Sequence, residues 1–204
     1  MTSLVQLVCD LADLFDRLQL PFALGGALAT NYWGVVRTTQ DIDCLVAVPA
    51  LKYQTLAEAL QTIGCRSRDD AGNLTEVTAV RLREEANDKK FMECFRDSVR
   101  IEMFIPAVPL QHEILRRAVM LPLGNREVPI TTAEDMILLK MAFHRVKDLQ
   151  DVRGILWIQR GQLDMNYLRN WSSRTHTEEV QRELEQFLQE YAASGPDDSA
   201  TAVQ

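Results

Sequence analysis

The segment from Phe22 to Val46 limits the possible folds most, because it places a short helical run between two short apolar runs. "FALGG" predicts a buried strand that ends in two glycines, and "ALATNYWG" predicts a helix that Gly34 closes. "DIDCLVAV" predicts a second strand, bounded by Pro49. A strand, a helix and a strand in this order are typical of an α/β unit.

Two aspartates stand at the start of the second predicted strand. Because side chains alternate along a strand, Asp41 and Asp43 point to one face, while Ile42 and Cys44 point into the core. Two neighbouring carboxylates repel each other unless a cation neutralises them, and Mg²⁺ is commonly held by one or two carboxylates plus substrate phosphates. For a D-x-D pair alone, an edge strand whose acids face water is the simpler interpretation.

The preceding glycines favour the metal interpretation. Gly25 and Gly26 have no Cβ, so a phosphate or another backbone segment can approach closely. The helix expected from Ala27 onward offers free N–H groups to an anion. The pair is weak by itself, because the sequence has neither G-x-G-x-x-G nor the G-K-[ST] of a P-loop at this point.

A third carboxylate lies in the run "VRIEMFI". Glu102 shares a strand face with Arg100 and Phe104, while Ile101 and Met103 form the other face. A lone acid on a buried face is costly, so Glu102 belongs either to a solvated face or to a polar site. Three carboxylates on neighbouring strands are able to hold two metal ions and to activate a hydroxyl for in-line attack on phosphorus.

Periodicity and turn residues predict the remaining elements. The predicted helices are residues 3–19, 51–64, 110–118, 131–161, 164–174 and 177–192. The predicted strands are residues 76–83, 89–96 and 99–105, and a hairpin over residues 119–130 that turns at Gly124-Asn125. We therefore expect an α/β core over residues 1–107, a mainly helical part over residues 108–195 and a disordered tail over residues 196–204.

Composition excludes several classes of protein. The net charge of −7 argues against a protein that coats nucleic acid, so any such contact needs a local basic patch. No apolar run approaches the roughly 20 residues that span a bilayer, so we expect no membrane partner. The acidic, amphipathic N-terminus is unlike a signal peptide. Four scattered cysteines without C-x-x-C indicate buried or free thiols in a reducing cytosol.

Two motifs in this order resemble the nucleotidyltransferase superfamily of the DNA polymerase β type. More narrowly, they resemble the bacterial group around AbiEii- and MenT-like toxins and related uncharacterised members. The first motif of that family, G-[GS] followed by D-x-D on the next strand, is matched here by Gly25-Gly26 and by Arg37-Thr38-Thr39-Gln40-Asp41-Ile42-Asp43. The second motif is helical, and "LKMAFHRVKDLQDV" supplies Lys140, Ala142, Arg145, Lys147, Asp148 and Asp151.

This resemblance implies an α/β (α+β) nucleotidyltransferase fold with a mixed sheet, followed by a C-terminal helical domain. It implies a metal-dependent enzyme that moves an NMP from an NTP to an acceptor hydroxyl, on a tRNA 3′ end or a protein side chain. It further implies a cytoplasmic toxin with a cognate antitoxin. The residues implied to hold Mg²⁺ or Mn²⁺ and to carry catalysis are Asp41, Asp43 and Glu102. The residues implied to bind the triphosphate are Gly25, Gly26, Arg37, Thr39, Lys140, Arg145 and Lys147.

Two departures from the family pattern favour an alternative function. Many members have serine where this chain has Gly26, and the third carboxylate is usually aspartate where this chain has Glu102. The alternative is a non-catalytic nucleotide-binding or interaction module that keeps the fold.

Lys140 is the most informative residue of the second motif, because it interrupts the apolar run "MILLKMAF". A buried ammonium needs either a carboxylate partner or a place at the edge of a cleft. The charged stretch that follows has two interpretations, a salt-bridged surface helix or a cationic wall for a triphosphate. Asp148 is interpreted as orienting a lysine or an arginine.

Overall fold

The computed structural model describes residues 3–193, and the predicted tail over residues 196–204 lies outside them. The chain forms two compact units. The first unit runs to Thr132 but leaves out residues 30–36, and the second combines residues 30–36 with the chain from Ala133 onward. Helix α2 (Gly26–Trp33) therefore begins in the first unit and ends in the second.

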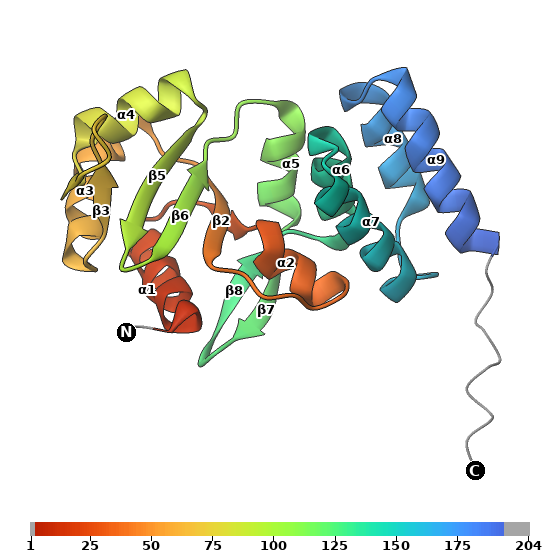
Figure 1. Cartoon of the computed structure of the whole chain (residues 1–204), viewed down its shortest axis with the longest axis horizontal. Coiled ribbons are helices and arrows are strands. Elements are labelled where there is room, and N and C mark those ends of the chain that lie inside the picture. Colours follow the sequence, from red (N-terminus) through yellow and green to blue (C-terminus); the bar gives the residue numbers. More distant parts are fainter. Residues whose placement is uncertain (1–2, 194–204) are drawn as a thin grey trace, which may run out of the picture. The chain divides into compact units, whose positions relative to one another are not determined.

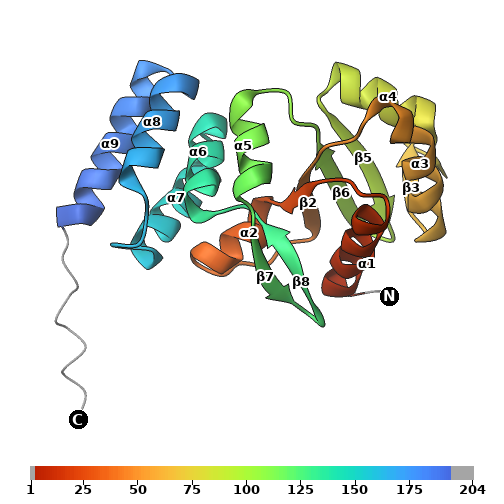
Figure 2. The same ribbon diagram turned by 180° about the vertical axis from the view of Figure 1, so that it is seen from behind.

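The first unit is built on one mixed sheet (Figures 1 and 2). Within residues 3–193 the sheet has eight strands in the order β4-β3-β5-β6-β2-β1-β8-β7. The pairs β2–β6 and β1–β8 are parallel and the other pairs are antiparallel. The strands are β1 (Phe22–Leu24), β2 (Asp41–Val46), β3 (Arg66–Arg68), β4 (Leu74–Glu76), β5 (Phe91–Arg96), β6 (Val99–Phe104), β7 (Val119–Leu123) and β8 (Arg126–Ile130).

One set of helices belongs to the first unit with the sheet, and another set forms the second unit. The first unit contains α1 (Leu4–Arg17), the 3₁₀ turn η1 (Ala50–Lys52), α3 (Tyr53–Thr62), α4 (Ala79–Asp88) and α5 (Pro109–Arg117). The second contains α6 (Ala133–Phe143), α7 (Val146–Ile158), α8 (Met165–Thr175) and α9 (Glu178–Ala193). The predicted α+β class, a mixed sheet followed by a helical part, is confirmed.

The central strands have one apolar and one polar face. Ile42, Cys44, Ile101 and Met103 point into the core and are almost completely buried. The residues between them along the strands are polar or aromatic and only partly buried. This alternation is the pattern expected of a sheet with one face against the core, and it leaves the polar face to carry chemistry.

The segment 30–36 belongs to the second unit through its contacts with α7. Gln159 Nε2 donates to the backbone oxygen of Trp33 at 3.1 Å. A Cβ added to Gly34 would lie 3.1 Å from a side-chain carbon of Ile155, and one added to Gly154 would lie 3.3 Å from Val35. The close backbone approach at these two glycines fixes the segment against α7.

The prediction of a strand over residues 76–83 is wrong beyond Glu76, because residues 79–88 form helix α4. Thr78 caps this helix, and its side-chain oxygen accepts a hydrogen bond from the N–H of Arg81. Arg81 and Glu85 then pair one turn apart. The alternating apolar residues of the sequence hid this capping signal.

The predicted continuous helix over residues 131–161 is interrupted after Phe143. His144 adopts a left-handed backbone conformation with φ 55°, which ends α6. A new helix, α7, then starts at Val146, and the carboxylate of Asp148 accepts a hydrogen bond from the N–H of Arg145 at its beginning. No glycine or proline marks this break in the sequence.

The grouping of residues 108–132 differs from the boundary expected at residue 107. These residues form α5 and the β7–β8 hairpin, and the contacts of the structure assign them to the first unit. The physical reason is strand pairing, because β8 joins the sheet beside β1 with Ile130 opposite Leu24. A pairing between segments this far apart in sequence leaves no local signal.

Candidate active site

Three carboxylates lie side by side on the polar face of the sheet, on neighbouring strands. Asp43 of β2 is paired with Glu102 of β6, and Glu102 is paired with Glu93 of β5. Residues directly opposite each other on neighbouring strands point to the same face. We call Asp43, Glu102 and Glu93 the carboxylate row. Like charges in such positions destabilise a sheet, so the row needs a cation or a proton.

Gly25 and Gly26 lie against the Asp43 end of the row. The N–H of Gly25 donates to the backbone oxygen of Asp43 at 2.8 Å. Gly26 has φ +54°, and a Cβ there would lie 1.9 Å from Oδ2 of Asp43. The carboxylate of Asp43 thus occupies the space that any side chain at position 26 would need. It lies at the first residue of α2, where the helix dipole favours negative charge.

Arg100 supplies the positive charge on this face. It is paired with Asp41 across β2 and β6, one position along from the carboxylate row. Its guanidinium lies 3.2 Å from Asp41 Oδ2, 3.4 Å from Glu102 Oε1 and 3.8 Å from Glu93 Oε2. One arginine therefore faces three of the four carboxylates, and the face retains excess negative charge.

Glu102 holds a proton more tightly than an ordinary glutamate. The pKa of Glu102 is raised to about 7, chiefly by burial; Arg100 opposes the rise, while the charge of Asp43, a hydrogen bond between these two carboxyls and the charge of Glu93 add to it. Its side chain is 16% exposed. At neutral pH the proton shared between Glu102 and Asp43 relieves part of their repulsion.

The raised pKa predicts a specific pH dependence of stability. Between pH 4.5 and pH 7 the folded protein keeps a proton on Glu102 that the unfolded chain releases. The contribution of Glu102 to the free energy of unfolding therefore falls as pH rises through this window. The change Glu102→Gln removes this dependence. We expect its free energy of unfolding, relative to wild type, to increase by about 1–3 kcal/mol between pH 4.5 and pH 8. Urea titrations in metal-free buffer measure this difference, and a difference constant with pH would contradict the assignment.

The donor set suits a hard divalent cation. Carboxylate oxygens are the ligands that Mg²⁺ and Mn²⁺ prefer, and a cation at the row would relieve the repulsion from Asp43 and Glu93 that adds to burial in raising the pKa of Glu102. Within residues 3–193, no three His, Cys, Asp or Glu side chains converge closely enough to hold a metal ion. Asp41 and Glu102 both contact Arg100. Metal binding would therefore require these side chains to turn away from the arginine.

The second motif forms a buried ion cluster in the helical unit. Lys140 is 6% exposed, and its Nζ lies 2.6 Å from Asp151 Oδ2 and 3.7 Å from Asp148 Oδ1. Asp148 also accepts hydrogen bonds from Arg145. Burial opposes ionisation of Asp148, but the Arg145 hydrogen bonds and the charge of Lys140 outweigh it and hold its pKa below the ordinary value. Lys140 thus has carboxylate partners, and its contact with a triphosphate stays a prediction.

This cluster predicts a large stability effect. The change Lys140→Ala would leave Asp148 and Asp151 buried without their ammonium, so we expect a loss of about 3–5 kcal/mol in the free energy of unfolding. Lys147→Ala, an exposed position on α7, is the matched control and should change the free energy of unfolding by less than about 0.5 kcal/mol. Equal urea midpoints for the two variants would show that the cluster contributes little.

The other predicted residues lie as follows. Thr39 Oγ1 accepts from the N–H of Asp41 at 3.2 Å and so shapes the entry into β2. Arg37 and Lys147 are exposed. Their roles in nucleotide binding stay predictions. Sequence reasoning missed Glu93, although it alternates with buried Met92 in the predicted strand over residues 89–96.

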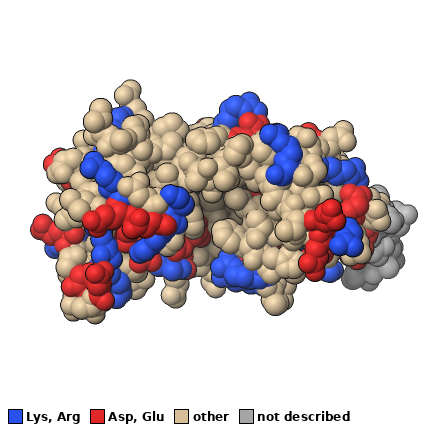
Figure 3. All heavy atoms as spheres, turned by 90° about the horizontal axis from the view of Figure 1, so that it is seen from above, with Lys and Arg blue, Asp and Glu red and all other residues tan. Residues whose placement is uncertain are grey.

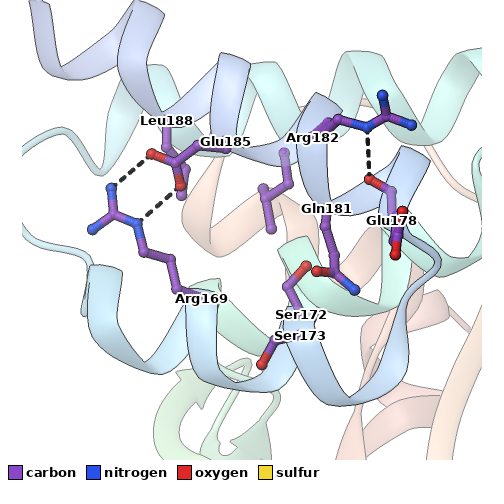
Figure 4. A pocket seen from close by; sticks show the side chains of 9 residues that line it. Arg169, Ser172, Ser173, Glu178, Gln181, Arg182, Glu185 and Leu188 are labelled. Carbon is purple, nitrogen blue, oxygen red and sulfur yellow. Dashed lines mark hydrogen bonds and ion pairs between the residues drawn. The ribbon is translucent and has the colours of Figure 1, made fainter.

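A separate groove lies between α8 and α9 in the helical unit (Figure 4). Its volume is about 510 Å³. Arg169 forms two hydrogen bonds with Glu185 across it, and Arg182 Nε donates to the backbone oxygen of Glu178 (Figure 4). Both arginines thus have partners among the residues that line the groove.

Charge on the surface is mixed. On the face drawn in Figure 3, acidic and basic side chains are interleaved over the described part of the chain, without a broad basic area. This agrees with the net charge of −7. Among the described residues, no helix combines the length and the apolar character that crossing a membrane requires.

Comparisons with known proteins found similarity only among solved structures. No protein-family model and no curated protein matches the sequence. The crystal structure of ANT(2")-Ia in complex with adenylyl-2"-tobramycin has 15% identity and a TM-score of 0.49, and the match covers 94% of this chain and 100% of that chain. Lincosamide antibiotic adenylyltransferase LnuA, lincomycin-bound, has 15% identity and a TM-score of 0.49 over 77% of this chain and 98% of that chain. An antigenic nucleotidyltransferase-like protein from Paracoccidioides brasiliensis has 16% identity and a TM-score of 0.47, with 91% of each chain covered.

These structural neighbours are nucleotidyltransferases. At these identities and TM-scores the similarity assigns this chain no family, substrate or mechanism. The narrower resemblance to AbiEii- and MenT-like toxins stays a prediction.

Proposed function

We propose that this protein is a metal-dependent nucleotidyltransferase that moves an NMP from an NTP to an acceptor hydroxyl and releases pyrophosphate. The observation that carries the proposal is the position of Asp43. Its carboxylate lies beside Glu102 on one side and against Gly26 on the other. The carboxylate of Asp43 thus adjoins a second carboxylate and the start of a helix, and we propose that the metal and the triphosphate bind there.

The residues proposed to hold Mg²⁺ or Mn²⁺ are Asp41, Asp43 and Glu102. The metal would neutralise charge on the reacting phosphates. Gly25 and Gly26 are proposed to contact the triphosphate near the start of α2, and Arg37 and Thr39 lie on the loop that leads into β2. We propose that three residues of the helical unit contribute positive charge to triphosphate binding: Lys140, Arg145 and Lys147. Lys140 also pairs with Asp148 and Asp151, which neutralise part of its charge.

The proposed acceptor follows from the resemblance described above. It is a tRNA 3′ end or a protein side chain. A toxin role in the cytoplasm, with a cognate antitoxin, is inherited from the same resemblance. The net charge of −7 favours a compact acceptor group over a long nucleic-acid duplex.

Incubation of the protein with each NTP labelled at the α-phosphate tests the proposal. The reaction contains Mg²⁺ and either total tRNA or cell lysate. We expect label in one acceptor fraction, together with released pyrophosphate. Chelation of the metal with EDTA should stop both.

The alternative function, a non-catalytic nucleotide-binding module, has one observation in its favour. Arg100 occupies the charge-neutralising position among the carboxylates. Nucleotide binding without metal, and without release of pyrophosphate, would support this alternative and contradict the proposed transfer.

A further inference from the structure

We propose that Glu93 binds the acceptor hydroxyl and takes its proton during nucleotidyl transfer. This inference rests on the proposed function and adds a residue to its site. Glu93 is the end of the carboxylate row farthest from the glycines, because the sheet order places β1, β2, β6 and β5 next to one another.

The order of the strands suggests from which side of the site the acceptor approaches. Gly25 and Gly26 follow β1, Asp43 lies on β2 and Glu93 lies on β5, with Glu102 between the last two. In phosphoryl transfer the attacking and leaving oxygens lie roughly in line. If the triphosphate lies at the glycines, pyrophosphate leaves on the β1 side. The acceptor must then approach from the β5 side, where Glu93 stands.

The carboxyl groups of Glu102 and Glu93 differ in their hydrogen-bond and ion-pair partners. The carboxyl of Glu102 is hydrogen-bonded to that of Asp43, which ties it to the metal end of the row. Among the described residues, Glu93 has one ion-pair partner, Arg100 at 3.8 Å, and its side chain is 27% exposed. Glu93 is therefore the carboxylate of the row that a hydroxyl from solution can reach without displacing a hydrogen bond between carboxyls.

The strand around Glu93 is held firmly and is partly apolar. Its backbone N–H donates to the buried carboxylate of Glu85 at 3.0 Å. Phe91 and Phe95 stand two residues before and after it, so their half-buried rings share its face of β5. Phe91 also packs against Phe104, with ring centroids 5.5 Å apart. A carboxylate on a firmly held strand is suited to fix the position of one hydroxyl.

The step balances as a simple displacement. The acceptor oxygen forms a bond to the α-phosphorus as its proton passes to the carboxylate of Glu93. The bond from the α-phosphorus to the bridging oxygen of the β-phosphate breaks, and pyrophosphate leaves with that electron pair. General-base assistance of this kind contributes about 10²–10⁴-fold in rate.

The test compares wild type, Glu93→Gln and Glu127→Gln. Glu127 is an exposed glutamate on β8, and its change controls for the loss of one carboxylate from the same sheet. Two quantities are measured with each α-labelled NTP and Mg²⁺. One is the rise in melting temperature on binding, and the other is pyrophosphate release with tRNA, lysate or concentrated glycerol as acceptor. We expect Glu93→Gln to keep the melting-temperature rise and to lose about 10²–10⁴-fold in transfer, while Glu127→Gln matches wild type.

Each failure has its own signature. Transfer by Glu93→Gln at the wild-type rate would overturn the role of Glu93 and leave the proposed function standing. Loss of the melting-temperature rise in Glu93→Gln would place this residue on the metal side of the row and overturn its role as acceptor base. A wild-type protein that releases no pyrophosphate with any acceptor would overturn the proposed function, and the role of Glu93 with it.

Discussion

Asp43→Asn should remove nucleotidyl transfer and metal-dependent nucleotide binding while the fold stays intact. Asparagine keeps the shape of aspartate and fits the space beside Gly26, but it removes the charge that a divalent cation needs. It also removes the repulsion with Glu102, so stability at pH 8 should be unchanged or higher. We expect a loss of at least about 10²–10³-fold in transfer, the scale of removing one electrostatic stabiliser of a transition state.

The binding measurement separates this effect from unfolding. A saturating ligand that binds only the folded state stabilises it by about 3 kcal/mol at 100 times Kd, which raises the Tm of a chain this size by on the order of 5–10 °C. Wild type should show this rise with Mg²⁺ and the correct NTP, and Asp43→Asn should not. Asp88→Asn, on the exposed end of α4, is the matched control and should behave as wild type. Equal rises in wild type and Asp43→Asn would show that Asp43 is not the metal ligand.

Gly26→Ala should destabilise the protein by about 3 kcal/mol or more. A left-handed backbone costs a residue with a Cβ about 1–2 kcal/mol, and Gly26 has φ +54°. The new methyl group would also lie 1.9 Å from Oδ2 of Asp43, so that the carboxylate would have to leave its place. Urea unfolding measures the total cost.

A control glycine isolates the contact with Asp43. Gly72 has φ +86° and nothing within 4 Å of its added Cβ, so Gly72→Ala should show the backbone cost alone. In an Asp43→Gly background the obstructing side chain is absent, and the cost of Gly26→Ala should fall to the Gly72→Ala value. Equal costs for Gly26→Ala and Gly72→Ala in the wild-type background would show that contact with Asp43 adds nothing to the cost. Position 26 would then not need glycine to make room for that carboxylate.

Local alternation predicted the faces of the strands but not their order. The spacing of Asp41 and Asp43 requires a common face in any sheet, and the structure shows both on the half-buried side of β2. That β6 lies beside β2 depends on a pairing across a long stretch of chain. The pairing of β5 with β6 is local, because only residues 97 and 98 separate the two strands. Glu93 was missed although this hairpin places it opposite Glu102, because the sequence prediction did not pair the two strands.

The partner of Lys140 was hidden by the break at His144. A continuous helix brings together residues three or four apart, whereas Asp151 lies eleven positions after Lys140. The two helices α6 and α7 turn back on each other after the left-handed residue, and this brings the charges together. The sequence could require a carboxylate for a buried lysine, but it could not say which one.

The course of helix α2 bears on how the protein can be dissected. A chain divided after Thr132 would give an N-terminal and a C-terminal fragment. Neither fragment would match a unit of the structure. The C-terminal fragment would lack the backbone oxygen of Trp33 that receives Gln159, and the packing of Val35 against Gly154 would also be lost. The N-terminal fragment would carry residues 30–36 without α7, and so without the same contacts. A fragment for separate study of the helical unit therefore needs residues 30–36 joined to the segment that begins at Ala133. In a simple truncation series, loss of activity would reflect misfolding and not the removal of a functional residue.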